Sequence, residues 1–224
     1  AYLTEVALVL DEIDYHSRNL KKWMKPGKVS SGLALFPSKS RIIHEPLGVV
    51  FIMSPWNYPF QLLINPLVGA ISAGNCAVLK PSAQTPNVTA VLKKLFTKYF
   101  KSDYIMLIDG NHEEINWIFG FRFDHIFFTG GTEGGKNILE KASNMLCPVT
   151  LELGGKSPCL VFEGIDLKLA AKRIAFGKFI NAGQTCIAPD YILVDEKIKD
   201  NLISALKEAI TGFHGENPVN SLHY

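Results

Sequence analysis

The sequence of 224 residues has few cysteines, and their spacing excludes two classes of small cross-linked protein. Cys76, Cys147, Cys159 and Cys186 lie far apart and form no C-x-x-C pair, so neither a zinc site nor a disulfide framework is expected. We therefore expect reduced thiols, a cytoplasmic protein and no bound metal. Each cysteine is by default an inert core residue unless its surroundings indicate otherwise.

The sequence also lacks an excess of charge of either sign, with 23 basic and 21 acidic residues. This near balance gives no reason to expect a nucleic acid or a membrane surface as a partner. No secretory signal is visible at its start. Hydrophobic residues at 47% and charged residues at 20% exclude intrinsic disorder and are typical of a folded globular protein.

One interval, residues 47–79, carries no charge, and a membrane span is the first alternative to consider. A spanning helix needs about 20 mostly apolar residues in succession. Pro55, Pro59 and Pro66, together with several asparagines and glycines, interrupt this interval repeatedly. We interpret it as a buried strand, a loop, a buried helix and a second strand. Membrane attachment through a segment outside this chain stays open.

Apolar strands alternate with amphipathic helices along the chain, which predicts a doubly wound, Rossmann-like α/β sheet with parallel strands. A first helix is expected over residues 4–23, followed by a loop or hairpin excursion over residues 25–45. The expected strands are residues 47–53, 76–79, 104–108, 125–128, 149–153, 158–162 and 191–194. The expected helices between and after them are residues 62–73, 86–100, 112–119, 135–144, 166–181 and 196–213. Sheets of this kind bind ligands beyond the carboxyl ends of their strands, so functional residues are expected directly after strands.

A glycine-rich turn follows the predicted strand at residues 125–128 and opens a helix. Glycines in this position let backbone N–H groups approach a phosphate, so we favour a nucleotide-binding turn over a plain turn. Thr132 breaks the G-x-G-x-x-G pattern. Gly130, Gly135 and Lys136 match the P-loop pattern, but Asn137 lacks the hydroxyl group that binds magnesium. A P-loop-like nucleotide-binding protein remains an alternative.

Two residues are candidates for covalent chemistry. Cys186 lies in a polar turn just past a predicted helix, where a thiolate is a plausible nucleophile; the alternative is a partly buried inert thiol. Glu152 ends an apolar strand, where we expect it to be buried, and burial makes it a candidate general base. Its alternative role is an ion pair with Lys156.

Two further candidates follow the strands of the charge-free interval. Pro55 and Pro59 fix the loop that holds Asn57, so its amide can point rigidly at a ligand; the alternative is a plain turn in which Trp56 packs. Lys80 follows the next strand and is placed to meet a ribose or a phosphate. Base rates favour the alternative, a solvated lysine.

Taken together, these motifs resemble those of the aldehyde dehydrogenase family, and most closely its class 3 and fatty-aldehyde branch. The resemblance covers nearly the whole chain, and the order and spacing of the motifs are highly specific. The matching segments are Pro55-Trp56-Asn57-Tyr58-Pro59, Leu79-Lys80-Pro81-Ser82, Phe128-Thr129-Gly130, residues 151–158 and Gly183-Gln184-Thr185-Cys186.

The resemblance implies oxidation of an aldehyde to the carboxylic acid through a thiohemiacetal and a thioester on Cys186. The Asn57 amide and the Cys186 backbone N–H would hold the oxyanion, and Glu152 would activate the hydrolytic water. It also implies NAD or NADP as cofactor, a small-molecule aldehyde as substrate, no nucleic acid, and a homodimer in the complete protein. The cofactor residues implied are Trp56, Lys80, Ser82, Thr129, Gly130, Gly131, Thr132, Gly135 and Leu153.

The chain departs from the family pattern in three ways. Pro66 stands where many relatives carry a lysine nine positions after the asparagine, which again favours the class 3 branch. Ala83 stands where many relatives carry a glutamate that binds the adenosine ribose, which leads us to expect that NADP is tolerated. The family's second half is absent, so residues 1–153 are expected to be the NAD(P)-binding domain and residues 154–224 the first part of a catalytic domain. This chain alone is expected to turn over no aldehyde. A cofactor-binding fragment without turnover and a cysteine–histidine hydrolase are the remaining alternatives.

Overall fold

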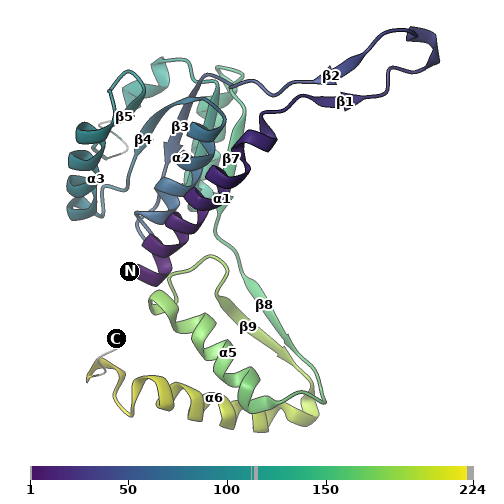
Figure 1. The fold of residues 1–224 in the computed structure, drawn as a ribbon. Coiled ribbons are helices and arrows are strands. Elements are labelled where there is room, and N and C mark those ends of the chain that lie inside the picture. The colour runs from purple at the N-terminus through teal and green to yellow at the C-terminus, as the bar shows by residue number, and fades with distance from the viewer. Residues whose placement is uncertain (1, 112, 114–115, 221–224) are drawn as a thin grey trace. The chain divides into compact units, whose positions relative to one another are not determined.

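The computed structural model describes residues 2–111, 113 and 116–220, and it divides into two compact units, Ala1–Glu152 and Leu153–Tyr224 (Figure 1). The first unit is built on a five-stranded sheet, and the second on a two-stranded sheet. The predicted helix at residues 112–119 falls partly outside the described residues. Within the described part, a short 3-10 helix spans Asn116–Gly120.

In the five-stranded sheet, the direction in which successive strands are added reverses at the central strand, β3 (Val49–Met53). This strand pairs in parallel with β4 (Cys76–Lys80) on one side and with β6 (His125–Gly130) on the other. β5 (Ile105–Leu107) lies outside β4, and β7 (Val149–Leu153) lies outside β6, so the strand order is β5-β4-β3-β6-β7. The chain therefore runs outward from β3 to β5 and then returns to the other side of β3. The predicted parallel α/β sheet is confirmed.

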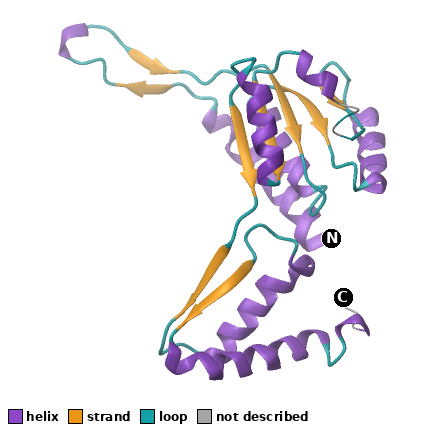
Figure 2. Ribbon diagram, turned by 180° about the vertical axis from the view of Figure 1, so that it is seen from behind, coloured by secondary structure: helices purple, strands orange, loops and turns teal. Residues whose placement is uncertain are grey.

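Helices cover both faces of this sheet (Figures 1 and 2). Three of them, α1 (Ala7–Trp23), α2 (Gln61–Ser72) and α3 (Pro86–Tyr99), share one buried cluster with β3, β4 and β5. Helix α4 (Thr132–Ser143) lies on the opposite face (Figure 2). Because helices cover both faces of the sheet, the side chains on both faces of its strands are apolar, which explains the continuous apolar runs in the sequence.

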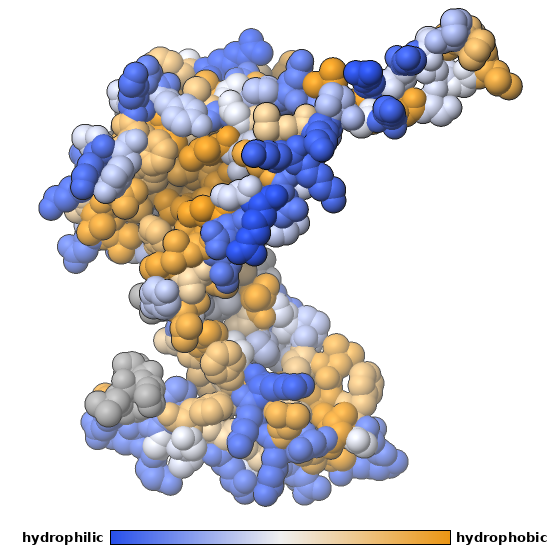
Figure 3. Space-filling view, in the orientation of Figure 1, coloured by the Kyte–Doolittle hydropathy of each residue, from blue (hydrophilic) through white to orange (hydrophobic). Residues whose placement is uncertain are grey.

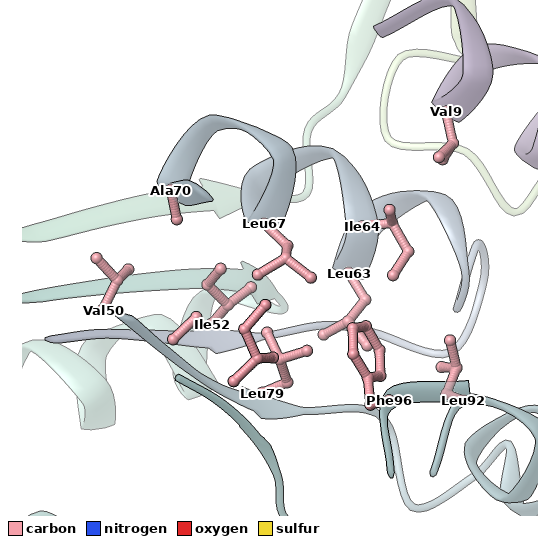
Figure 4. Close-up of a cluster of buried hydrophobic side chains, with 12 residues drawn as sticks. Val9, Val50, Ile52, Leu63, Ile64, Leu67, Ala70, Leu79, Leu92 and Phe96 are labelled. Carbon is pink, nitrogen blue, oxygen red and sulfur yellow. The ribbon is translucent and has the colours of Figure 1, made fainter. Parts of the chain in front are cut away.

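The alternation along β3 shows how both faces are filled. Val50 and Ile52 lie in the cluster formed with α2 and α3 (Figure 4). Phe51, between them, points to the other face, where its ring stacks on Phe123 with centroids 4.9 Å apart. The charge-free interval is thus a core strand, a loop, the buried helix α2 and the core strand β4. No helix among the described residues is long and apolar enough to cross a membrane.

Most predicted helix ends are confirmed by the local geometry. Gly74 ends α2 with a φ of 83°, and Pro86 begins α3 in its first turn. In the second unit, Asp166 accepts hydrogen bonds from the N–H groups of Lys168 and Leu169 and so caps α5 (Leu167–Phe179).

The second unit is a β–α–β arrangement with one added helix. β8 (Ser157–Val161) pairs in parallel with β9 (Pro189–Val194), and α5 makes the crossover that parallel pairing requires. Helix α6 (Lys199–His214) packs against α5 through small side chains, among them Ala171, Ala175 and Ala209.

A hairpin leaves the first unit between α1 and β3. β1 (Gly27–Val29) and β2 (Ser40–Ile42) pair antiparallel. Apolar side chains gather at its free end (Figure 3), where Leu33, Leu35 and Phe36 are exposed.

Candidate active site

The loop after β3 carries two of the predicted site residues. The backbone N–H of Ser54 donates to the carbonyl oxygen of Lys80 at 3.1 Å, which extends the pairing of β3 and β4 by one residue. Trp56 is exposed and Asn57 is half-buried in the loop that leads to α2. The predicted rigid loop is therefore anchored where the strand ends.

Lys80, at the end of β4, is buried, with 4% of its surface exposed. The alternative of a solvated lysine is wrong, because Nζ donates to the carbonyl oxygen of Pro81 at 2.9 Å inside the fold. The next turn is closed by Ser82, whose Oγ accepts a hydrogen bond from the N–H of Gln84 at 3.2 Å. A buried ammonium group needs polar partners, which fixes the position of the lysine head group.

The turn after β6 is shorter than predicted. Helix α4 begins at Thr132, three positions before the predicted start at Gly135, so Gly131 alone separates strand from helix. A Cβ added at Gly130 would lie 2.5 Å from Cζ of Phe128, and one at Gly134 would lie 2.9 Å from the same atom. The Phe128 ring therefore occupies the space that these two glycines leave.

This geometry argues against the P-loop alternative. A P-loop places a flexible glycine-rich loop before its helix, whereas here Gly135 is already inside α4 and its N–H donates to the carbonyl oxygen of Gly131 at 3.0 Å. Gly131 itself is different. No atom lies within 4 Å of the position its Cβ would take, and as the N-cap residue it gives α4 no side-chain cap.

A cavity of about 380 Å³ lies at the carboxyl ends of β3, β4 and β6. It includes the point where the strand order reverses, which is the usual ligand site of such sheets. Six predicted cofactor residues line it: Trp56, Lys80, Ser82, Thr129, Gly130 and Gly131. The other lining residues are Met53, Ser54, Pro55, Ala83, Gln84, Asn111, Phe128 and Gly134.

The chemistry of this lining suits an anionic ligand. None of these described lining residues is an aspartate or a glutamate. The uncapped N-terminus of α4 begins beside Gly131, and helix N-termini of this kind bind phosphate through backbone N–H groups. Sequence reasoning missed Ser54, Gln84 and Asn111 as lining residues. The signal was available for Ser54, which directly follows a buried strand.

The remaining predicted residues of the first unit lie apart from this cavity's lining. Asn57, Thr132, Gly135 and Glu152 do not line it. The expected burial of Glu152 is wrong: its side chain is exposed near the end of β7, because β7 is an edge strand of the sheet. Leu153, which ends β7 and begins the second unit, is half-buried.

Lys156, the expected partner of Glu152 in the alternative interpretation, has another partner. Its Nζ lies 3.4 Å from Oδ2 of Asp190, and Nζ of Lys178 lies 3.8 Å from the other carboxylate oxygen of Asp190. The carboxylate of Asp190 thus ties the loop after β7 to the beginning of β9.

Cys186 is exposed, whereas Cys76 and Cys159 are half-buried and Cys147 is buried. Burial raises the pKa of the Cys147 thiol, and the nearby charge of Asp124 raises it further. Of the four thiols, that of Cys186 is the most accessible to a substrate. Among the residues that the structure describes, no group of three histidines, cysteines or carboxylates is arranged to hold a metal ion.

The backbone before Cys186 departs from the predicted helix. Helix α5 ends at Phe179, because Ile180 leaves the helical conformation with a ψ of 136°, and Asn181 and Ala182 then adopt left-handed conformations with φ of 52° and 54°. The carbonyl oxygen of Cys186 accepts a hydrogen bond of 3.4 Å from Oγ of Ser157. The turn that carries the thiol is therefore connected to the beginning of β8.

Comparison with known proteins agrees with the motifs. Residues 1–222 match the aldehyde dehydrogenase family. The chain belongs to the aldehyde dehydrogenase family. It is 50% identical over its whole length to 4,4'-diaponeurosporen-aldehyde dehydrogenase of Staphylococcus aureus, covering 49% of that protein. It is 45% identical over its whole length to aldehyde dehydrogenase family 3 member A2 of Macaca fascicularis, covering 46% of that protein.

These matches confirm the predicted likeness to the class 3 branch. The chain spans about half the length of the curated relatives it matches. Among solved structures, a substrate-bound state of Staphylococcus aureus AldH superposes with a TM-score of 0.95 at 49% identity, covering 100% of this chain and 49% of that one. The fold described above is therefore that of the first half of known aldehyde dehydrogenases.

The solved structures include one relative described as NAD-dependent and another described as NADP-dependent. An NAD-dependent aldehyde dehydrogenase from Sinorhizobium meliloti is 30% identical, with a TM-score of 0.80 over 89% of this chain and 40% of that one. An NADP-dependent enzyme from E. coli is 27% identical, with a TM-score of 0.82 over 96% of this chain and 45% of that one. Homologues of this chain are thus NAD- or NADP-dependent.

Proposed function

We propose that the protein containing this chain oxidises an aldehyde to a carboxylic acid and reduces NAD(P)⁺. The observation that carries the proposal is the exposed thiol of Cys186 in a chain that belongs to the aldehyde dehydrogenase family. The cavity at the carboxyl ends of β3, β4 and β6 supports it as a nucleotide site. We further propose that residues 1–153 form the cofactor domain, that residues 154–224 begin the catalytic domain, and that the complete protein is a homodimer.

Three residues are proposed to carry the chemistry. The Cys186 thiolate attacks the aldehyde carbon, and the oxygen becomes an oxyanion that the Asn57 amide and the Cys186 N–H stabilise. An amide suits this role because it donates hydrogen bonds without protonating the thiolate. After loss of hydride a thioester remains, and water attacks it while Glu152 accepts the proton. The carboxylic acid then leaves, and the thiolate is regenerated.

The residues that line the cavity fit a dinucleotide cofactor. Lys80 and Ser82 are proposed to bind the adenosine ribose or its phosphate, while Thr129, Gly130 and Gly131 lie beside the uncapped N-terminus of α4, which suits a pyrophosphate. When bound, NAD(P)⁺ supplies the hydride acceptor. We also assign Trp56, Thr132, Gly135 and Leu153 to this cofactor site as a proposal from the family resemblance.

We propose that both NAD and NADP are accepted. Ala83 lines the cavity beside Ser82, so no carboxylate at that position repels a 2′-phosphate. The buried Lys80 ammonium adds positive charge nearby. The relative from Staphylococcus aureus is named for a 4,4'-diaponeurosporen aldehyde, and we propose only that the present protein takes an aldehyde.

Formation of reduced cofactor tests the proposal. The complete protein is expected to raise the absorbance of reduced nicotinamide when it is given hexanal and NAD⁺. Cys186→Ser is expected to abolish this signal, because a hydroxyl group is a much weaker nucleophile at neutral pH. Full activity in that variant would contradict the mechanism. The chain of 224 residues by itself is expected to bind cofactor without turnover, and rapid turnover by this chain would contradict that expectation.

A further inference from the structure

Glu5 joins the N-terminal segment to the start of α2, and we propose that it is a positioning residue for the Asn57 amide. Oε2 of Glu5 accepts hydrogen bonds from the backbone N–H of Phe60 at 2.8 Å and from that of Gln61 at 3.3 Å. The two ends of this contact lie 55 residues apart in the sequence. The inference rests on the proposed function, in which Asn57 stabilises the oxyanion.

Glu5 provides what the local sequence of α2 cannot. The N-cap residue of this helix is Phe60, whose side chain accepts no hydrogen bond. The first N–H groups of a helix have no partner within the helix and need an acceptor from elsewhere. A carboxylate is well suited, because its charge also interacts favourably with the positive end of the helix dipole. Glu5 therefore fixes where α2 begins.

The start of α2 is also one end of the loop that carries Asn57. At the other end, the Ser54 N–H donates to the carbonyl oxygen of Lys80 at 3.1 Å. Only residues 55–59 lie between these two anchors, and Pro55 and Pro59 have fixed φ angles. Asn57 is the middle residue of this short, stiff segment. A shift of the first turn of α2 is therefore transmitted to Asn57.

A shift of this kind matters for catalysis because an oxyanion donor acts only when it is correctly placed. A misplacement of about 1 Å can cost roughly a hundredfold in rate. The Asn57 amide is proposed to act on the oxyanion and not on the bound cofactor. Removing Glu5 should then slow hydride transfer and leave cofactor affinity unchanged, a pattern that simple loss of stability does not produce.

The test is a double-mutant cycle in the complete protein. Single-turnover formation of reduced cofactor from hexanal is measured for the wild type, Glu5→Ala, Asn57→Ala and the variant with both changes. We expect Glu5→Ala to slow this step about tenfold to a hundredfold when Asn57 is present, and to slow it no further when Asn57 is absent. Glu5→Gln keeps one acceptor oxygen and should recover part of the rate.

The matched control is Asp14→Ala, which removes an exposed carboxylate from α1 whose ion pair with Arg18 spans 3.4 Å on the surface. It should leave the rate unchanged. Equal slowing by Glu5→Ala in both backgrounds, or a lower melting temperature with an unchanged rate, would overturn the positioning role and leave the proposed function standing. A wild-type protein that forms no reduced cofactor would overturn both.

Discussion

The ring of Phe128 lies in the space where Gly130 would carry a side chain: a Cβ placed there would be 2.5 Å from Cζ of Phe128. Phe128 is buried in β6, and a methyl group added at Gly130 would force its ring to shift. Gly130→Ala should therefore lower the free energy of unfolding by roughly 1–3 kcal/mol through overpacking. Thermal or urea unfolding of the variant measures this loss, and an unchanged stability would show that the ring moves freely.

The neighbouring glycine provides a matched comparison. Gly131 has open space around its Cβ position and a φ of −77°, which any residue adopts. Gly131→Ala should leave stability within about 0.5 kcal/mol of the wild type, since neither strain nor a clash is introduced. Because Gly131 lines the cavity, the added methyl group should weaken NAD(P)⁺ binding. Calorimetric titration checks this, and unchanged affinity would remove Gly131 from the cofactor site.

The burial of His125 should make the free energy of unfolding decrease at acidic pH. Its Nε2 lies 3.0 Å from Oγ1 of Thr150 between β6 and β7, and burial lowers its pKa from the ordinary value of 6.5. The unfolded chain therefore binds a proton at a higher pH than the folded chain does. Stability from this residue is complete above about pH 6.5 and is lost as the pH falls through and below that value.

The measurement compares the free energy of unfolding of the wild type with that of His125→Gln, whose amide can keep a hydrogen bond to Thr150. Between about pH 7 and pH 5 the wild type should lose more free energy of unfolding than the variant. Urea unfolding at several pH values gives both curves. Parallel curves would show that His125 does not contribute to the acid sensitivity.

Local patterns predicted the elements well where sequence neighbours determine them. The apolar runs gave β3 and β4, Pro86 marked the start of α3, and Asp166 marked the start of α5. The rule that ligands bind after parallel strands placed Trp56 and Lys80, among others, around one cavity.

Tertiary contacts determined what the sequence did not reveal. Two glycines near its start made α4 look shorter, because glycine is a poor helix former. Packing of the Phe128 ring explains why one of them, Gly134, carries no side chain inside the helix. Lysine side chains are mostly exposed in proteins, so the burial of Lys80 was not predicted. No local sequence signal indicated the left-handed conformation of Ala182 or the hydrogen bonds that Glu5 accepts at the start of α2.

The four cysteines should differ in reactivity in a predictable order. Cys186 is exposed, whereas Cys147 is buried and its pKa is raised by burial and by Asp124, which leaves it little thiolate. A limiting amount of iodoacetamide near neutral pH should alkylate Cys186 first and Cys147 last. Peptide mass mapping of the folded protein gives the order. Early labelling of Cys147 would show that the region around β7 opens readily.

Ala83 should decide part of the preference between NAD and NADP. It lines the cavity next to Ser82 and near the buried Lys80, so a glutamate there would place a negative charge where a 2′-phosphate is proposed to lie. Ala83→Glu should therefore lower kcat/KM for NADP⁺ by about tenfold or more, since like charges at close range repel, and leave or improve that for NAD⁺. Ala83→Gln, of nearly the same size but neutral, separates charge from bulk and should retain more NADP⁺ activity. Equal losses in the two variants would mean that bulk, not charge, excludes the phosphate. A wild-type protein that uses NAD⁺ alone would contradict the proposed tolerance directly.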